Sequence, residues 1–143
     1  MERLKFDEFK TGRRLLGSLP HRRDLIKSIE AFCKAASVQM AVFAISGAVS
    51  SVTLGTYDQK QQVYVTCKKE EPFEIVTCTG NLSLKDGDSF IQASGVFANE
   101  QGAVIGGRIF SETILFAAEI DLTELRGKPL DRKYEHRTGL LLW

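Results

Sequence analysis

The chain has 143 residues, with 19 Lys and Arg against 18 Asp and Glu, so its formal net charge is only +1. A chain of this length buries roughly two-thirds of its unfolded surface, which is enough for one hydrophobic core. The near-neutral charge argues against a strongly basic nucleic-acid-binding domain, and the longest apolar stretches, such as residues 38–49, are too short to cross a membrane. Because residues 1–5 are charged and no apolar region follows them, we expect a cytoplasmic protein with no membrane partner.

The first predicted elements are two strands, at residues 4–9 and 13–19, followed by one main helix at about 22–37. In the helical segment, apolar residues recur at three- and four-residue steps and form one stripe: Leu25, Ile26, Ile29, Phe32, Cys33 and Ala36. Pro20 precedes the segment. Asp24 lies near its first turn, where a negative charge complements the helix dipole. We therefore expect an amphipathic helix that covers a sheet.

The remainder of the chain reads almost entirely as strand. Strands are expected at 40–45, 49–57, 62–67, 73–82 and 113–125, with breaks at Gly47, Asp58, Gly87 and Gly127. No internal repeat or linker divides the sequence. The fold class predicted is α+β, with residues 1–143 forming a single compact domain that is mainly an antiparallel β-sheet.

A β-hairpin is predicted at residues 89–110, where two strand-like segments flank the turn sequence 99–102. Gly102 can adopt positive φ, which favours a three-residue loop with a bulge glycine. This register places Asn99 opposite Ala103 and Arg108 opposite Ser94. Gln92 is then a diagonal neighbour on the same face, because side chains alternate along a strand. One face of the hairpin should carry a polar cluster and the other should be apolar.

The whole chain resembles the plants-and-prokaryotes conserved domain, which also occurs in plant AT-hook nuclear proteins. The resemblance rests on six short blocks in order: LPHRRDL at 19–25, SGAV at 46–49, FEIV at 73–76, GNLSLKDG at 80–87, GG at 106–107 and TGL at 138–140. It implies a compact, sheet-rich domain that assembles as a homotrimer. In the family, the block matching FEIV is associated with partner binding in plant members.

Many prokaryotic members carry three histidines on the hairpin that can hold a zinc-like ion. The matching positions here are Gln92, Ser94 and Arg108, so the resemblance implies a degenerate metal site. An amide and a hydroxyl are poor zinc ligands and a guanidinium repels the ion, so no metal cofactor is expected. Arg108 instead supplies a positive charge suited to a carboxylate or phosphate. The other interpretation is that Arg108 pairs with an internal carboxylate, Glu74 or Glu119, in a structural bridge.

Basic pairs at Arg13, Arg14, Arg22 and Arg23 form a possible basic surface for DNA. Acidic residues offset them, and the Arg-Gly-Arg segment of an AT-hook does not occur in the sequence.

Catalytic residues are not identified, because no nucleophile, phosphate-loop or metalloprotease motif occurs in the sequence. His21 and His136 can rebuild a metal triad only between subunits. Cys33, Cys67 and Cys78 lack metal-site spacing and are expected to be reduced and buried.

These observations predict a non-catalytic, homotrimeric domain that binds a small ligand, such as an anion, or a protein partner. The first alternative is an accessory DNA-binding protein. The second is an enzyme with a site at a subunit interface.

Overall fold

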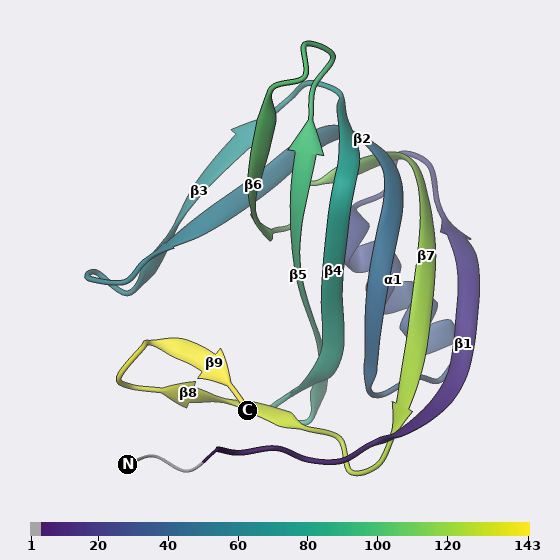
Figure 1. Cartoon of the computed structure of the whole chain (residues 1–143), viewed down its shortest axis with the longest axis vertical. Helices are drawn as coiled ribbons and strands as arrows, with labels where there is room; N and C mark the ends of the chain where they lie inside the picture. Colours follow the sequence, from purple (N-terminus) through teal and green to yellow (C-terminus); the bar gives the residue numbers. More distant parts are fainter. Residues whose placement is uncertain (1–3) are drawn as a thin grey trace.

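A strongly curved β-sheet dominates residues 4–143, which are the residues that the computed structural model describes. The strands are β1 (Lys10–Leu19), β2 (Ala41–Asp58), β3 (Val63–Lys69), β4 (Phe73–Lys85), β5 (Asp88–Ala98), β6 (Val104–Ile109), β7 (Ile114–Arg126), β8 (Asp131–Glu135) and β9 (Leu140–Leu142). Their order is β1-β7-β2-β6-β5-β4-β8-β9, and β3 pairs with β2 (Figure 1). The predicted α+β class and single domain are therefore confirmed.

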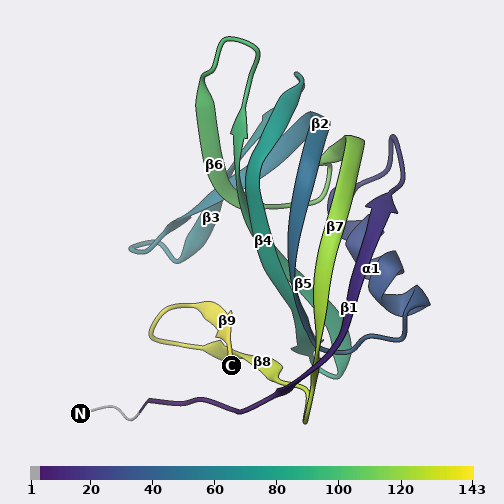
Figure 2. The same ribbon diagram turned by 45° about the vertical axis from the view of Figure 1, so that its right-hand side comes forward.

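The helix α1 (Leu25–Ala35) lies against one face of this sheet (Figure 2). Its buried residues include Leu25, Ile29 and Cys33, which belong to the predicted apolar stripe, so the amphipathic helix is confirmed with slightly tighter bounds. Sheet residues such as Phe43 and Leu122 join them in the core. Apolar burial of this kind is the main favourable contribution to folding. Within residues 4–143, no helix is long and apolar enough to span a membrane.

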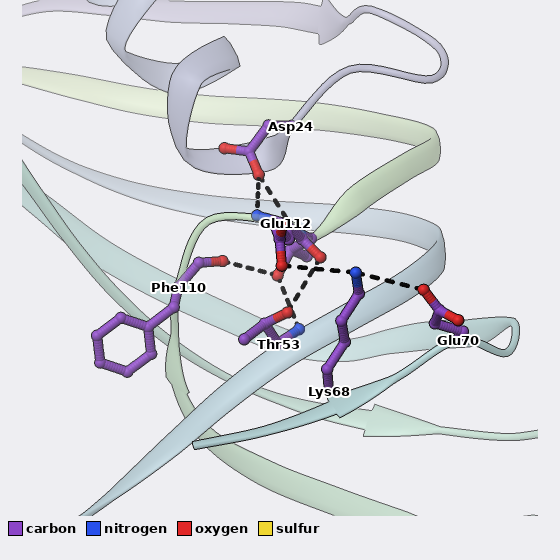
Figure 3. A network of polar contacts seen from close by, with 7 residues as sticks. Asp24, Thr53, Lys68, Glu70, Phe110 and Glu112 are labelled. Carbon is purple, nitrogen blue, oxygen red and sulfur yellow. Dashed lines mark hydrogen bonds and ion pairs between the residues drawn. The ribbon is translucent and has the colours of Figure 1, made fainter. Parts of the chain in front are cut away.

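Asp24 caps the helix and also ties it to the loop between β6 and β7 (Figure 3). Its Oδ2 accepts a hydrogen bond from the backbone N–H of Lys27 at 3.0 Å, as an N-cap does. Its Oδ1 accepts from the backbone N–H groups of Glu112 at 2.7 Å and Thr113 at 3.1 Å. Thr113 is fully buried, and its hydroxyl in turn accepts from the Thr53 N–H. One carboxylate therefore fixes the helix to β2 and β7.

The predicted strand break at Gly47 is wrong, because β2 runs through it as one strand of 18 residues. Gly47 has φ +129° and lies at a register shift in the pairing of β2 with β4. A Cβ there would collide with the carbonyl oxygen of Ala117 on β7. The glycine therefore marks a β-bulge within a strand, and it lets β2 bend. The first half of β2 pairs with β4 and β7, and its second half pairs with β3 and β6.

The two ends of the chain also differ from the prediction. Residues 4–9 form no strand, and Leu4 and Phe6 are 93% and 88% exposed. The apolar residues of this segment predicted a strand, but no neighbouring strand within residues 4–143 pairs with it. At the other end, the short strands β8 and β9 were missed, because charged residues and a length of three to five residues give a weak pattern. β8 pairs in parallel with the end of β4 through Leu84 and Asp131. The C-terminal hairpin is thereby placed beside the sheet.

Candidate functional site

Two rows of side chains cross the face of the sheet that is opposite α1. One row follows cross-strand partners from Leu16 on β1 through Asp121, Ala44, Thr79 and Ser94 to Arg108 on β6. The next row runs through Arg14, Thr123, Val42, Asn81 and Gln92. Cross-strand partners share a face of a sheet. The predicted pairing of Ser94 with Arg108 is confirmed, and Gln92 belongs to the same face.

A cavity of about 630 Å³ opens on this face. Gln92 and Ser94 line it together with Asn81, Thr79 and the ion pair of Arg14 with Asp121. Its lining provides amide and hydroxyl groups, which donate and accept hydrogen bonds. Two of the three positions predicted to match the family's metal ligands, Gln92 and Ser94, therefore line this cavity, and Arg108 lies directly across the strand pair from Ser94.

The guanidinium of Arg108 lies among aromatic rings. Its Nη1 donates to the Tyr64 hydroxyl at 3.1 Å, and its Cζ lies 5.0 Å from the centre of that ring. The rings of Phe110 and Phe90 are 5.3 and 5.9 Å away. Aromatic faces attract a cation through their quadrupole and hold it in place without neutralising its charge. Arg108 therefore retains an unbalanced positive charge.

The suggested salt bridges of Arg108 with Glu74 or Glu119 do not form. Within residues 4–143, Arg108 has no ion pair with any carboxylate. Glu74 lies on β4 opposite Ala98 and lines a different cavity, of about 390 Å³. Glu119 lies on β7 opposite Ser46 and lines a third cavity, of about 540 Å³. The register of the sheet separates both carboxylates from the strand β6 on which Arg108 lies.

Arg132 on β8 is a charged residue that sequence reasoning missed. It is only 6% exposed, yet its Nη1 and Nη2 donate to the Leu141 carbonyl at 3.0 Å and to Asn81 Oδ1 at 2.9 Å. Its Cζ lies 4.4 Å from the ring centre of Trp143 and 6.0 Å from that of Phe90. Its buried Nε has no hydrogen-bond partner. Burial, and then the charge of Arg108, lower the pKa of this guanidinium. Between Asp131 and Lys133, nothing in the sequence marked Arg132 as buried.

Two of the four arginines of the predicted basic surface are neutralised within the chain. Arg13 forms a salt bridge with Glu124 at 2.9 Å, and Arg14 forms one with Asp121 at 2.7 Å. The hydrogen bonds from Arg13 lower the pKa of Glu124 to about 2, and those from Arg14 lower the pKa of Asp121. Arg22 and Arg23 are exposed in the turn before α1. The four residues therefore do not form a continuous, unpaired basic patch.

The histidines and cysteines do not come together. His21 contacts the Phe116 carbonyl through Nδ1 at 2.6 Å, whereas His136 lies in the turn between β8 and β9. In the part of the chain that the structure describes, no three His, Cys, Asp or Glu side chains are arranged to hold a metal ion. Cys33 and Cys78 are buried as predicted. Cys67 is exposed, contrary to the prediction, because β3 lies at an edge of the sheet.

Known proteins similar to this chain share its fold over nearly the full length. A metal-containing protein from Archaeoglobus fulgidus is 35% identical, with a TM-score of 0.93 and coverage of 98% of this chain and 99% of that one. A plant- and prokaryote-conserved protein from Pyrococcus horikoshii is 31% identical, with a TM-score of 0.91 and coverage of 98% and 96%. A candidate DNA-binding protein from Bacteroides thetaiotaomicron is 20% identical, with a TM-score of 0.82 and coverage of 95% and 96%, which shows the fold alone.

No curated protein matches the sequence. The profile of the Plants and Prokaryotes Conserved (PCC) domain, however, matches residues 6–126, which is most of the chain. The match includes the hairpin β5–β6 and all but one of the sequence blocks that carried the resemblance. The resemblance inferred from the sequence is thus confirmed, and the chain belongs to the Plants and Prokaryotes Conserved domain family.

Proposed function

We propose that this chain is a non-catalytic binding domain whose ligand is a small anion, held by Arg108 beside Gln92 and Ser94. The observation that carries the proposal is the unbalanced charge of Arg108, which is held by Tyr64 and has no carboxylate partner within residues 4–143. A guanidinium presents planar donors that match a carboxylate or phosphate. The Gln92 amide in the neighbouring row and the Ser94 hydroxyl in the same row as Arg108 supply further hydrogen bonds to such a ligand.

The donor set does not fit a metal ion, although one similar protein is described as metal-containing. Divalent zinc takes imidazole, thiolate or carboxylate, and the cation of Arg108 opposes any second cation nearby. We therefore propose that the site operates without a metal. Elemental analysis of untagged protein purified without chelators should give less than one tenth of an ion per chain, and one ion per chain would contradict this part of the proposal.

The proposed assembly is a homotrimer. Support comes from large apolar side chains that remain exposed on the strands; among them, Leu16 on β1, Val76 on β4 and Phe116 on β7 are 72%, 60% and 60% exposed. Exposed apolar side chains on sheet strands are commonly covered by other copies of the same chain. Light scattering coupled to size exclusion should give three times the chain mass of 15.9 kDa. A mass of one chain at micromolar concentration would contradict the assembly.

DNA binding is less well supported for this chain than the binding of a small anion. Similar folds carry a candidate DNA-binding description, but Arg13 and Arg14 are already paired with Glu124 and Asp121. Phosphates of DNA would have to compete with those carboxylates, and the net charge of +1 provides little general attraction. A gel shift with a strong inverse dependence on salt would favour DNA over a small anion.

Anion binding is tested by thermal unfolding in sodium phosphate and in sodium succinate at constant ionic strength. A ligand that binds only the folded state raises the melting temperature. The rise should be saturable in the wild type and absent in Arg108→Gln. Arg23→Gln is the control, because Arg23 is an exposed arginine in the turn before α1. Equal rises in all three proteins would refute a role for Arg108.

A further inference from the structure

A second unneutralised guanidinium lies near the proposed anion site. Arg108 on β6 and Arg132 on β8 approach the same ring, that of Phe90, with Cζ-to-centre distances of 5.9 and 6.0 Å. Among the residues that the structure describes, neither forms an ion pair with a carboxylate. With no counter-ion, the two like charges repel each other, and the charge of Arg108 contributes to the lowered pKa of Arg132. An anion bound between them removes that repulsion.

Arg132 is placed to interact with a ligand rather than with solvent. More than nine-tenths of its surface is buried, and its Nε is a buried donor with no acceptor. Such groups are rare in folded proteins, because an unpaired buried donor loses its hydrogen bonds to water. Its Nη2 donates to Asn81 Oδ1, and Asn81 lines the 630 Å³ cavity that Gln92 and Ser94 share. The buried guanidinium is therefore linked to the wall of the proposed site.

Two hairpins hold the arginines in position. Tyr64, which accepts the hydrogen bond from Arg108, lies on β3, and Arg132 lies on β8 of the C-terminal hairpin. The tips of these hairpins approach each other (Figure 1). Gln62 Nε2 donates to the Arg137 carbonyl at 2.9 Å, and the Tyr57 hydroxyl donates to the Thr138 carbonyl. These contacts fix the spacing of the two guanidiniums before any ligand arrives, which lowers the entropic cost of binding.

The surroundings favour an organic acid over a bare inorganic ion. Phe90, Phe110, Tyr64 and Trp143 all lie within 6.0 Å of one guanidinium or the other. Aromatic side chains favour the apolar body of a ligand, whereas inorganic phosphate has none and keeps its hydration. A carboxylate has two oxygens in one plane, which match the fork of a guanidinium. We infer that Arg132 is a second binding residue and that the ligand is a small organic carboxylate. This inference rests on the proposed anion-binding function.

The experiment uses the full chain and two readouts, thermal unfolding and the fluorescence of Trp143, the only tryptophan. Sodium benzoate and sodium succinate are titrated against sodium phosphate, with sodium chloride keeping the ionic strength constant. The variants are Arg108→Gln, Arg132→Met and Arg132→Lys, with Arg23→Gln as control. Because Trp143 lies 4.4 Å from Arg132, a carboxylate that binds there should change its emission.

We expect a carboxylate to raise the melting temperature and change Trp143 emission in the wild type and in Arg23→Gln. Arg132→Met and Arg108→Gln should each weaken binding by about ten- to a hundredfold, the loss of one hydrogen-bonded charge. Arg132→Met should fold, because it removes a buried charge that has no counter-ion and replaces it with a flexible apolar side chain. Arg132→Lys keeps the charge and loses the fork, so its affinity should fall between those of the wild type and Arg132→Met.

The outcomes separate this inference from the function on which it rests. If Arg108→Gln loses binding while both Arg132 variants retain wild-type affinity, Arg132 is not a ligand residue, although the anion site stands. If phosphate binds and neither carboxylate does, the ligand class is wrong. If every variant responds as the wild type does, neither Arg132 nor Arg108 binds the ligand, and both this inference and the proposed function are wrong.

Discussion

Asp24 and Glu112 are joined by a hydrogen bond of 2.7 Å across 88 residues of sequence, from the Glu112 backbone N–H to Asp24 Oδ1. The same oxygen accepts from Thr113, while the other carboxylate oxygen caps α1 at Lys27 (Figure 3). A local capping signal in the sequence therefore has a long-range role as well. It anchors the loop between β6 and β7, directly after the strand that carries Arg108.

Asp24→Ala should lower the free energy of unfolding by about 2–3 kcal/mol. The change removes the helix cap, which typically contributes about 1 kcal/mol, and leaves two further backbone N–H groups without an acceptor. Urea denaturation measures the loss. Asp24→Asn is the matched control, because its amide oxygen still accepts one set of these bonds, and it should be less destabilised. Equal stability of all three proteins would show that water replaces the carboxylate at no cost.

The ion pair of Arg13 with Glu124 predicts a dependence of stability on pH. Hydrogen bonds from the Arg13 side chain and backbone lower the pKa of Glu124 from its ordinary 4.5 to about 2. The folded state therefore favours the ionised form, and this stabilisation is complete above pH 4.5 and is lost as the pH falls toward 2. Glu124→Gln should be less stable at pH 7 and should lose less stability between pH 5 and pH 2. Urea titrations at pH 7, 5, 4, 3 and 2 test this, and a parallel dependence of stability on pH in the two proteins would contradict it.

The three cysteines should differ in reactivity. Burial raises the pKa of Cys33 to about 11 and that of Cys78 to about 12, so both thiols stay protonated at neutral pH. Cys67 is exposed on the edge strand β3. A maleimide at pH 7 should therefore label the native protein once per chain, and Cys67→Ser should abolish the labelling. More than one label on native protein would indicate opening of the core around α1 or β4, and denaturation in urea should expose all three thiols.

Gly47 and Gly102 provide a matched pair of substitutions at positive φ. Gly47→Ala places a methyl group against the backbone of Ala117 and should cost more than about 3 kcal/mol, as expected where both strain and overlap occur. Gly102 has φ +80° in the turn between β5 and β6, and no atom lies within 4 Å of an added Cβ. Gly102→Ala should therefore cost only about 1 kcal/mol. Thermal unfolding of both variants measures the loss of stability. Equal losses for Gly47→Ala and Gly102→Ala would contradict the predicted clash with Ala117.

Local patterns in the sequence predicted a large part of the fold. The helix follows from one apolar stripe with Leu25, Ile29 and Cys33, and the hairpin register follows from the turn at Gly102. Both depend on interactions between residues close in sequence, which a single chain records directly. The pairing of Arg108 with Ser94 was accessible for the same reason. The strand proposed for residues 4–9 failed because apolar composition does not create a pairing partner.

Residue patterns alone were enough to predict the α+β class and the family, and the prediction that Gln92, Ser94 and Arg108 replace the family's histidines also comes from the sequence. The tertiary structure alone decided which charges are balanced. Arg13 and Arg14 meet carboxylates more than 100 residues away, whereas Arg108 meets aromatic rings and Arg132 is buried beside Trp143. Whether a charged side chain finds a counter-ion depends on strand order and register over the whole chain. Residue type and spacing along the sequence do not contain that information.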